Sequence, residues 1–186
     1  MALLASTSVI ESHRAGDRKI VAPQDDYVGD HREYVLAPFA YRSASRFSDG
    51  SFGVLYAAET RETALREILS KLSRTYLDGR APAQETRKRH LTLRLVAANL
   101  VDICRARVPR TDAALYDPAN YSAAQAFGAK IRERHPGLTY DSVRHRAGIC
   151  VGAFVPRIVS DVRLQSALSV VWDGRRFIEQ KDIRPL

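Results

Sequence analysis

The stretch that most constrains the fold lies between residues 52 and 78, where a short apolar run leads directly into a helical pattern. The run "FGVLYAA" follows a Ser-Asp-Gly cluster and has the length and composition of a buried strand entered from a turn. Thr60 is a suitable N-cap and Glu62 falls in the first turn of the helix. Apolar residues then recur at helical spacing until Asp78-Gly79 ends the pattern: Ala64, Leu65, Ile68, Leu69, Leu72 and Tyr76. We therefore expect a buried strand joined by a tight turn to an amphipathic helix.

Four later segments add strands and a second helix. "HLTLRLVAANLVDI" begins with alternating leucines and polar residues, which favours a strand, and "GICVGAFVP" has the composition of a buried strand. "YSAAQAFGAKIRERHPG" predicts a helix from a Ser122 cap to the stop at His135-Pro136-Gly137. In "ALSVVWDGRRFIEQ", Asp173-Gly174 separates two strand-like runs and indicates a hairpin. Strands, helices and an antiparallel pair together predict an α+β fold rather than a doubly wound parallel sheet.

The chain has the length of a single domain. Its 186 residues, 45% of them apolar, suffice for one hydrophobic core. The first residues carry turn formers and mixed charge with weak periodicity, so we expect an N-terminal arm over 1–36 and a first strand near Tyr41. The folded domain is then expected over 37–186.

Charge and composition narrow the class of partner. Lys and Arg number 29 against 21 Asp and Glu, a net charge of +8 that suits nucleic acid, a nucleotide or an acidic protein surface. No stretch has the roughly 20 apolar residues of a membrane span, and the N-terminus does not resemble a signal peptide. Two cysteines, Cys104 and Cys150, are too few for a disulfide framework. We expect a cytoplasmic protein with no membrane partner and, because no histidines pair at ligand spacing, no metal.

Single residues in the opening stretch have ordinary explanations. Glu67 projects away from the apolar stripe, and the simplest account is a solvated carboxylate paired with Lys71 and worth roughly 0.2 to 0.5 kcal/mol. Tyr56 ends an apolar strand and is typical of a core tyrosine with its hydroxyl at the rim. Arg46 is typical of a surface arginine, and Ser142 of a turn residue or cap.

The basic run "TRKRH" has two interpretations. Residues 87–90 could form a nucleic-acid patch, but the run lacks the interleaved aromatic residues that stack on bases. A solvated entrance to the following strand is the favoured interpretation.

Taken together, five segments resemble the RES-domain family of bacterial toxins, over positions 38 to 156, and within it the ParT-like branch. Tyr41-Arg42 fits the first element, and Ser45-Arg46-Phe47 stands where Gly-Arg-Trp is usual. Tyr56 and Glu67 keep the family's eleven-residue interval, and "GLTYDSVR" supplies Ser142. Arg42 and Arg46 are only four positions apart, which leaves open which of the two arginines meets the ligand.

The resemblance implies an ADP-ribosyltransferase-like fold, a mixed β core flanked by helices, that consumes NAD as a substrate and needs no metal. Breaking the bond between nicotinamide and ribose develops positive charge on the sugar, so a carboxylate beside it is required. Glu67 would stabilise that cation and Tyr56 would stack on the nicotinamide. Arg46, or Arg42, would clamp the diphosphate, and Ser142 would position Glu67 or the ribose.

The resemblance also implies partners. A cognate Xre-type antitoxin would block the site, a host protein would accept ADP-ribose, and nucleic acid would be met only through the antitoxin. One alternative keeps the site but passes ADP-ribose to water or phosphate, which makes the protein an NAD glycohydrolase or phosphorylase. A second alternative, from a different class, is a non-catalytic basic module that binds nucleic acid, with affinity that falls steeply with salt.

Overall fold

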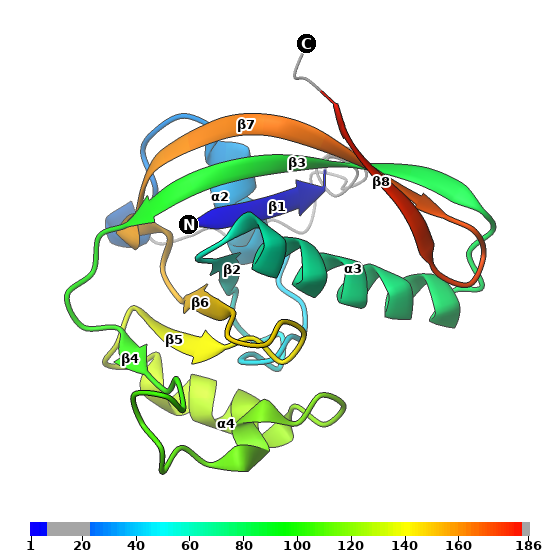
Figure 1. The fold of residues 1–186 in the computed structure, drawn as a ribbon. Coiled ribbons are helices and arrows are strands. Elements are labelled where there is room, and N and C mark those ends of the chain that lie inside the picture. The colour runs from blue at the N-terminus through cyan, green and yellow to red at the C-terminus, as the bar shows by residue number, and fades with distance from the viewer. Residues whose placement is uncertain (7–22, 184–186) are drawn as a thin grey trace.

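The computed structural model describes residues 1–6 and 23–183, and their backbone is organised around one sheet (Figure 1). Its strand order is β4-β5-β6-β2-β1-β3-β7-β8. Neighbouring strands are antiparallel except for β4 and β5, which are parallel. The strands are β1 (Ala2–Ser6), β2 (Leu55–Ala58), β3 (Gln84–Leu95), β4 (Val101–Asp102), β5 (Gly137–Asp141), β6 (Ile149–Ala153), β7 (Val159–Trp172) and β8 (Phe177–Ile183).

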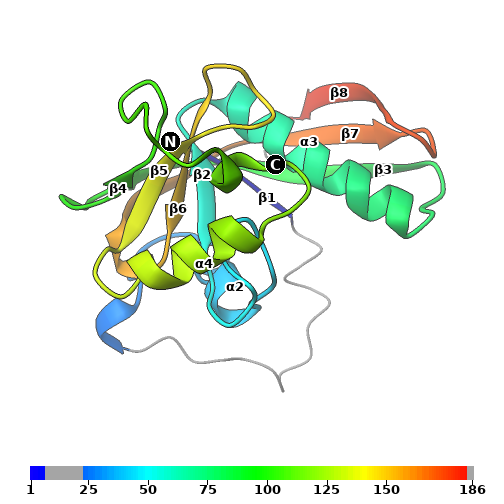
Figure 2. The same ribbon diagram turned by 90° about the horizontal axis from the view of Figure 1, so that it is seen from below.

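Within the described residues, three α-helices pack on the sheet (Figure 2), and the side chains of strand β2 show which face each helix covers. The helices are α2 (Arg32–Ala40), α3 (Arg61–Asp78) and α4 (Ser122–Ile131), with short 3-10 turns η1 (Pro23–Asp25), η2 (Ala113–Tyr116) and η3 (Pro156–Ile158). Leu55 and Ala57 of β2 belong to a buried cluster with α2. Tyr56 and Ala58 belong to a second cluster, with α3 and α4. Because successive side chains of a strand point to opposite faces, the sheet separates two cores, and the α+β architecture is confirmed.

The predicted strand and helix of the opening stretch are both present. Helix α3 begins after Thr60, whose hydroxyl accepts a hydrogen bond from the Thr63 amide at 3.2 Å, and it ends at Asp78 before Gly79. Helix α4 also forms, but the predicted cap is wrong. Ser122 is its first residue, and the Asn120 side chain accepts the hydrogen bond from the Ser122 amide instead.

The N-terminal region differs from the prediction. The strand expected near Tyr41 is wrong, because α2 occupies residues 32–40 and the Tyr41 amide closes it on the Ala37 carbonyl. Strand β1, expected to lie in an arm, instead fills a central position between β2 and β3. The proposed division after residue 36 therefore passes through α2, while residues 7–22 of the arm lie outside the described residues.

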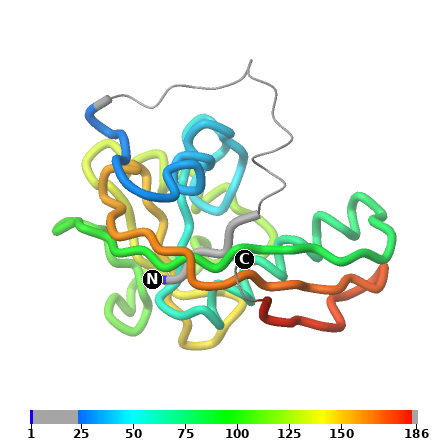
Figure 3. The backbone as a smooth tube through the Cα atoms, turned by 90° about the horizontal axis from the view of Figure 1, so that it is seen from above, coloured from blue at the N-terminus to red at the C-terminus, as the bar shows by residue number. Residues whose placement is uncertain are grey.

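The predicted hairpin is confirmed as β7 and β8, in which Trp172 pairs with Phe177. The aromatic rings of Tyr76, Trp172 and Phe177 lie within 6 Å of one another and join the end of α3 to this hairpin. Figure 3 shows β3, β7 and β8 running together alongside α3. Within the basic run, Arg87 and Arg89 are exposed whereas Lys88 is buried, as alternation along β3 requires.

Two further expectations concern the whole chain. Both cysteines are buried and unpaired. Among the described helices, none is long and apolar enough to span a bilayer.

Candidate active site

The predicted site residues come from four segments that meet on the face of the sheet covered by α3 and α4. Tyr56 lies on β2, Glu67 on α3, Arg46 in the turn that precedes β2, and Ser142 directly after β5. Strand β6 pairs with both β2 and β5, so it brings the end of β5 beside β2. Helix α3 then crosses the same region, contacting both β2 and β6.

Glu67 and Ser142 are in direct contact. The Ser142 hydroxyl donates a hydrogen bond of 2.5 Å to Oε1 of Glu67 across 75 positions of sequence. Both residues are at least partly withdrawn from solvent, and Ser142 is buried. Among the described residues no ion pair joins Glu67 to Lys71, so the weak pairing that spacing alone favoured does not form.

The loop over residues 142–148 fixes the direction of the Ser142 hydroxyl. Its oxygen accepts backbone N–H bonds from Arg144 at 3.1 Å and His145 at 2.9 Å. With the lone pairs of the oxygen occupied in this way, its proton is left to donate to Glu67. The Ser142 amide in turn donates to the Gly148 carbonyl at 2.7 Å, which closes the loop.

His145 fastens this loop to the first turn of α3. Its Nδ1 lies 2.8 Å from the Thr63 hydroxyl, which lies 2.8 Å from the Thr60 hydroxyl. Its Nε2 lies 3.5 Å from a carboxylate oxygen of Glu62. A Cβ at Gly148 would approach two atoms of the Thr63 side chain to 2.7 Å, so only glycine lets the loop come this close to the helix.

Tyr56 positions the turn that carries Arg46. Its hydroxyl lies 2.9 Å from the Ser45 hydroxyl and accepts the Phe47 amide at 3.0 Å. Burial raises the pKa of Tyr56 to about 12, against the smaller opposing effects of these hydrogen bonds and of the Arg46 charge. The expectation of a hydroxyl bonded at the rim of the core is confirmed, and the stacking of Tyr56 on nicotinamide stays a prediction.

Arg46 is held by backbone carbonyls and by an aromatic ring. Its Nη1 donates to the carbonyl of Leu115 at 3.2 Å and to that of Asp117 at 2.9 Å. Its guanidinium lies 4.6 Å from the centre of the Tyr121 ring. The side chain is only 9% exposed, so the expected surface arginine is in fact buried.

Arg42 and Phe47, which lie near Arg46 in the sequence, anchor the turn to α2 and to the core. Arg42 donates to the carbonyls of Phe39 at 3.3 Å and Ser51 at 2.9 Å, which links α2 to the turn. Phe47, which stands in place of the usual tryptophan, is fully buried and packs edge-to-face on Tyr140 at 4.9 Å. Of the two candidate arginines, Arg46 therefore shares a cluster with Tyr56, whereas Arg42 contacts backbone on the α2 side.

The charge of Glu67 acts on two buried side chains of the core, Tyr140 and Cys150. Burial raises the pKa of Tyr140 well above its ordinary value and that of Cys150 to about 12, and the charge of Glu67 contributes to both shifts. The electrostatic effect of a charge on a neighbouring group is strongest where water is excluded. The carboxylate of Glu67 therefore lies close to the buried core on this face of the sheet.

A surface hollow of about 570 Å³ opens beside Ser142. Of the predicted site residues only Ser142 lines it, so the hollow is next to the Glu67 contact and does not enclose it. Four basic residues contribute to its wall: Arg105, Arg144, His145 and Arg146. The volume falls within the range of small-molecule sites, and the charge favours an anionic occupant.

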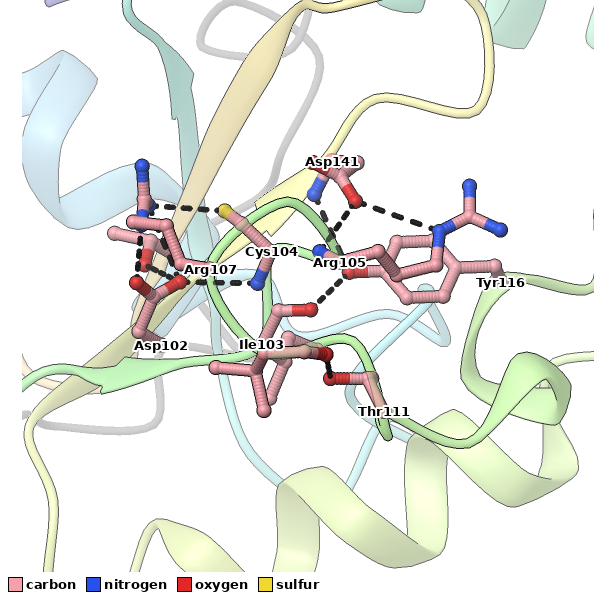
Figure 4. Close-up of polar contacts among 10 residues, drawn as sticks. Asp102, Ile103, Cys104, Arg105, Arg107, Thr111, Tyr116 and Asp141 are labelled. Carbon is pink, nitrogen blue, oxygen red and sulfur yellow. Dashed lines mark hydrogen bonds and ion pairs between the residues drawn. The ribbon is translucent and has the colours of Figure 1, made fainter.

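One wall of this hollow is a loop fastened by paired charges (Figure 4). Asp102 forms an ion pair with Arg107 and accepts the Cys104 amide at 2.9 Å. Arg105 lies 4.4 Å from the centre of the Tyr116 ring and 3.5 Å from the Asp141 carboxylate. These contacts hold the wall in place.

Sequence reasoning missed several residues of this region. His145 and Thr63 gave no signal of their own, because a lone histidine and a threonine in a helix have many ordinary roles. Tyr121 and Arg74 were missed for the same reason, although Arg74 donates to the Tyr121 hydroxyl at 2.9 Å. The described residues include no cluster of three or more metal-ligating side chains, and the expectation of a metal-free site stays a prediction.

A comparison with protein-family models agrees with the sequence resemblance. No curated protein matches the chain. Among solved structures, one match is the crystal structure of the M. tuberculosis MbcT-MbcA toxin-antitoxin complex, at 13% identity and a TM-score of 0.48, covering 78% of this chain and 74% of that one. The model of the RES domain matches residues 21–173, which is most of the chain. The protein therefore belongs to the RES domain family.

Proposed function

We propose that this protein is a toxin of a toxin-antitoxin pair that cleaves NAD and transfers ADP-ribose to a host protein. Family membership supports NAD as the substrate. The observation that carries the proposal is the 2.5 Å contact between Ser142 and Glu67, because it joins the two most specific parts of the family pattern at one point. A serine and a glutamate 75 positions apart have no local reason to meet.

The chemistry follows from charge. When the bond between the ribose anomeric carbon and the nicotinamide nitrogen breaks, its electron pair leaves with the nitrogen and the sugar becomes an oxocarbenium-like cation. The nucleophile of the acceptor then bonds to that carbon and loses its proton. Glu67, held through Oε1 by Ser142, has its second oxygen to bind the ribose hydroxyls and stabilise the cation.

Two other residues would orient the substrate. Arg46 would bind the diphosphate, since guanidinium groups form charge-assisted, often bidentate bonds to phosphate. Tyr56 would present its ring to the positively charged nicotinamide. Its hydroxyl, tied to Ser45 and Phe47, would hold the Arg46 turn against that ring.

The basic hollow beside Ser142 favours a second candidate function. An anionic acceptor such as inorganic phosphate would be attracted to Arg105, Arg144 and Arg146. The protein would then act as an NAD phosphorylase, or with water as a glycohydrolase, and would deplete NAD without labelling a protein. A cognate antitoxin of the Xre type is proposed for either function, with acidic groups that meet the arginines and block the site.

Mass spectrometry of NAD and its products tests the proposal. The protein is incubated with labelled NAD and cell extract, and with NAD plus either buffer or phosphate alone. Wild type should release nicotinamide and label a protein band. Glu67→Gln should lower the rate by about 10²- to 10³-fold, the usual cost of removing one charge-stabilising group, while remaining folded.

Glu133→Gln is the matched control, because it neutralises an exposed carboxylate near the end of α4 and should keep full activity. Intact NAD with no labelled band would rule out the proposal. Free ADP-ribose, or its phosphate ester, without a label would select the second candidate. If Glu67→Gln unfolds the chain, the placement of Glu67 in a site rather than in the core is wrong.

A further inference from the structure

Three arginines from different segments converge on Tyr121, the residue that precedes α4. The Arg46 guanidinium lies 4.6 Å and that of Arg74 5.8 Å from the centre of the Tyr121 ring. Arg74, from the last turns of α3, also donates to the Tyr121 hydroxyl at 2.9 Å. Arg144 donates to the Pro118 carbonyl at 3.0 Å and lies close enough to Tyr121 to help lower the pKa of its hydroxyl. We call Arg46, Arg74, Tyr121 and Arg144 the Tyr121 cluster.

No salt bridge among the described residues neutralises the arginines of the cluster. Over residues 1–6 and 23–183, none of its three arginines forms an ion pair with a carboxylate. Asp117 supplies only its carbonyl to Arg46, although the Arg46 charge helps to lower the pKa of its carboxylate. Like charges held close together repel, so the arrangement costs free energy that a bound anion would offset.

The pKa of the Tyr121 hydroxyl reflects the positive potential of the cluster. Although burial acts to raise its pKa, the hydrogen bond from Arg74 and the charges of Arg46 and Arg74 lower it. Most buried tyrosines shift the other way, as Tyr56 and Tyr140 do. The field at the Tyr121 hydroxyl therefore favours negative charge.

Three of the four cluster residues are at least partly exposed, Arg46 is buried, and the cluster borders the candidate active site. Arg74 is exposed, and Tyr121 and Arg144 are partly exposed. Three residues of the hollow, Asp117, Pro118 and Arg144, are members or contacts of the cluster. Arg46 belongs both to this cluster and to the proposed active site, because the Tyr56 hydroxyl holds the turn that carries Arg46.

From this geometry we propose that the Tyr121 cluster binds the diphosphate of the dinucleotide, with Arg74 and Tyr121 as binding residues in addition to Arg46. The inference rests on the proposed function for the identity of the ligand. Arg46 and Arg144 would contact phosphate oxygens from two sides of the ring, and Arg74 would add a third charge from α3. The Tyr121 ring would hold the guanidinium groups at fixed positions from which each can bind a phosphate oxygen.

Calorimetric titration in the inactive Glu67→Gln background tests this. The ligands are NAD, inorganic diphosphate, and nicotinamide riboside, which has the reactive bond without the diphosphate. Arg74→Gln should weaken NAD and inorganic diphosphate about tenfold, as expected for one lost charge-assisted contact, and leave nicotinamide riboside unchanged. Tyr121→Leu should weaken the same two ligands, and Tyr121→Phe should do so less.

Arg163→Gln on β7 is the matched control, because Arg163 is exposed and pairs with Asp161 away from the cluster. Undiminished diphosphate binding by both Arg74→Gln and Tyr121→Leu would overturn the inference. If neither substitution weakens NAD binding, the inference is overturned while the proposed function stays in place. Binding of diphosphate that depends on Arg74, without any binding of NAD, would keep the anion site and refute the proposed function.

Discussion

Tyr116 and Tyr121 each carry an arginine close over the ring, and their surroundings differ in one respect. Arg105 lies over Tyr116 at 4.4 Å and Arg46 over Tyr121 at 4.6 Å. Around Tyr116 the charges are paired, Arg105 with Asp141 and Arg107 with Asp102 (Figure 4). Around Tyr121, within the described part of the chain, no carboxylate pairs with an arginine.

The pKa values of the two phenols reflect this difference. Burial raises the pKa of Tyr116 to about 12, and its hydroxyl donates to the Ile103 carbonyl at 2.6 Å. The pKa of Tyr121 is lowered, because the unpaired arginines outweigh burial. The paired charges around Tyr116 hold a loop, whereas the unpaired arginines around Tyr121 form the anion site that we propose.

Asp102→Ala tests the paired region and has the largest expected effect on stability in this comparison. The change removes the partner of Arg107 and the acceptors for the Cys104 amide and the Thr139 hydroxyl. We expect the free energy of unfolding to fall by about 1 to 2 kcal/mol, a figure reduced because Asp102 is partly exposed. Chemical denaturation measures it, and diphosphate binding should be unchanged. A loss of binding with no loss of stability would reverse the assignment of the two regions.

His145→Ala tests how the loop over 142–148 acts through Ser142. Without its contact to Thr63, Ser142 should point less well at Glu67, so we expect kcat to fall about tenfold, near 1.4 kcal/mol, with little change in KM for NAD. Thr63→Val should reproduce this, and His145→Asn should restore activity because its amide can occupy the Nδ1 position. If His145→Asn is as slow as His145→Ala at equal thermal stability, the loop is not positioned in this way.

The smallest expected effect is on the loss of stability at acidic pH, and it depends on the Asp102 carboxylate. The hydrogen bond from Arg107 leads the contacts that hold the pKa of Asp102 below its ordinary value of 3.8. A carboxyl with a depressed folded pKa stabilises the fold above the unfolded value, and this contribution is lost as the pH falls through the folded value. Below pH 3.8 the wild type should therefore lose stability more steeply than Asp102→Asn. Parallel acid limbs, measured by denaturation at several pH values, would contradict this.

Much of the local structure was predictable because its causes are local. The Thr60 cap, the apolar stripe of α3 and the Asp-Gly turn before β8 depend on neighbouring residues, and all three were recognised. The start of α4 was misassigned by one position, because its N-cap is Tyr121, which makes no side-chain capping bond, and the Asn120 side chain accepts the Ser122 amide. The strand expected near Tyr41 failed because burial against β2 and η3 favours the helix α2 there.

The residues of the candidate site likewise fall into those that the sequence identified and those that only the tertiary structure brought together. By itself the sequence determined the family and the residues that its motifs mark, Arg46, Tyr56, Glu67 and Ser142, because motif spacing is a property of the chain. Only the tertiary structure decided that Glu67 meets Ser142 rather than Lys71, and that Arg74 and Tyr121 join Arg46. The physical reason is that sheet pairing of β5, β6 and β2 sets these distances, and contacts between segments so far apart in sequence leave no periodic pattern.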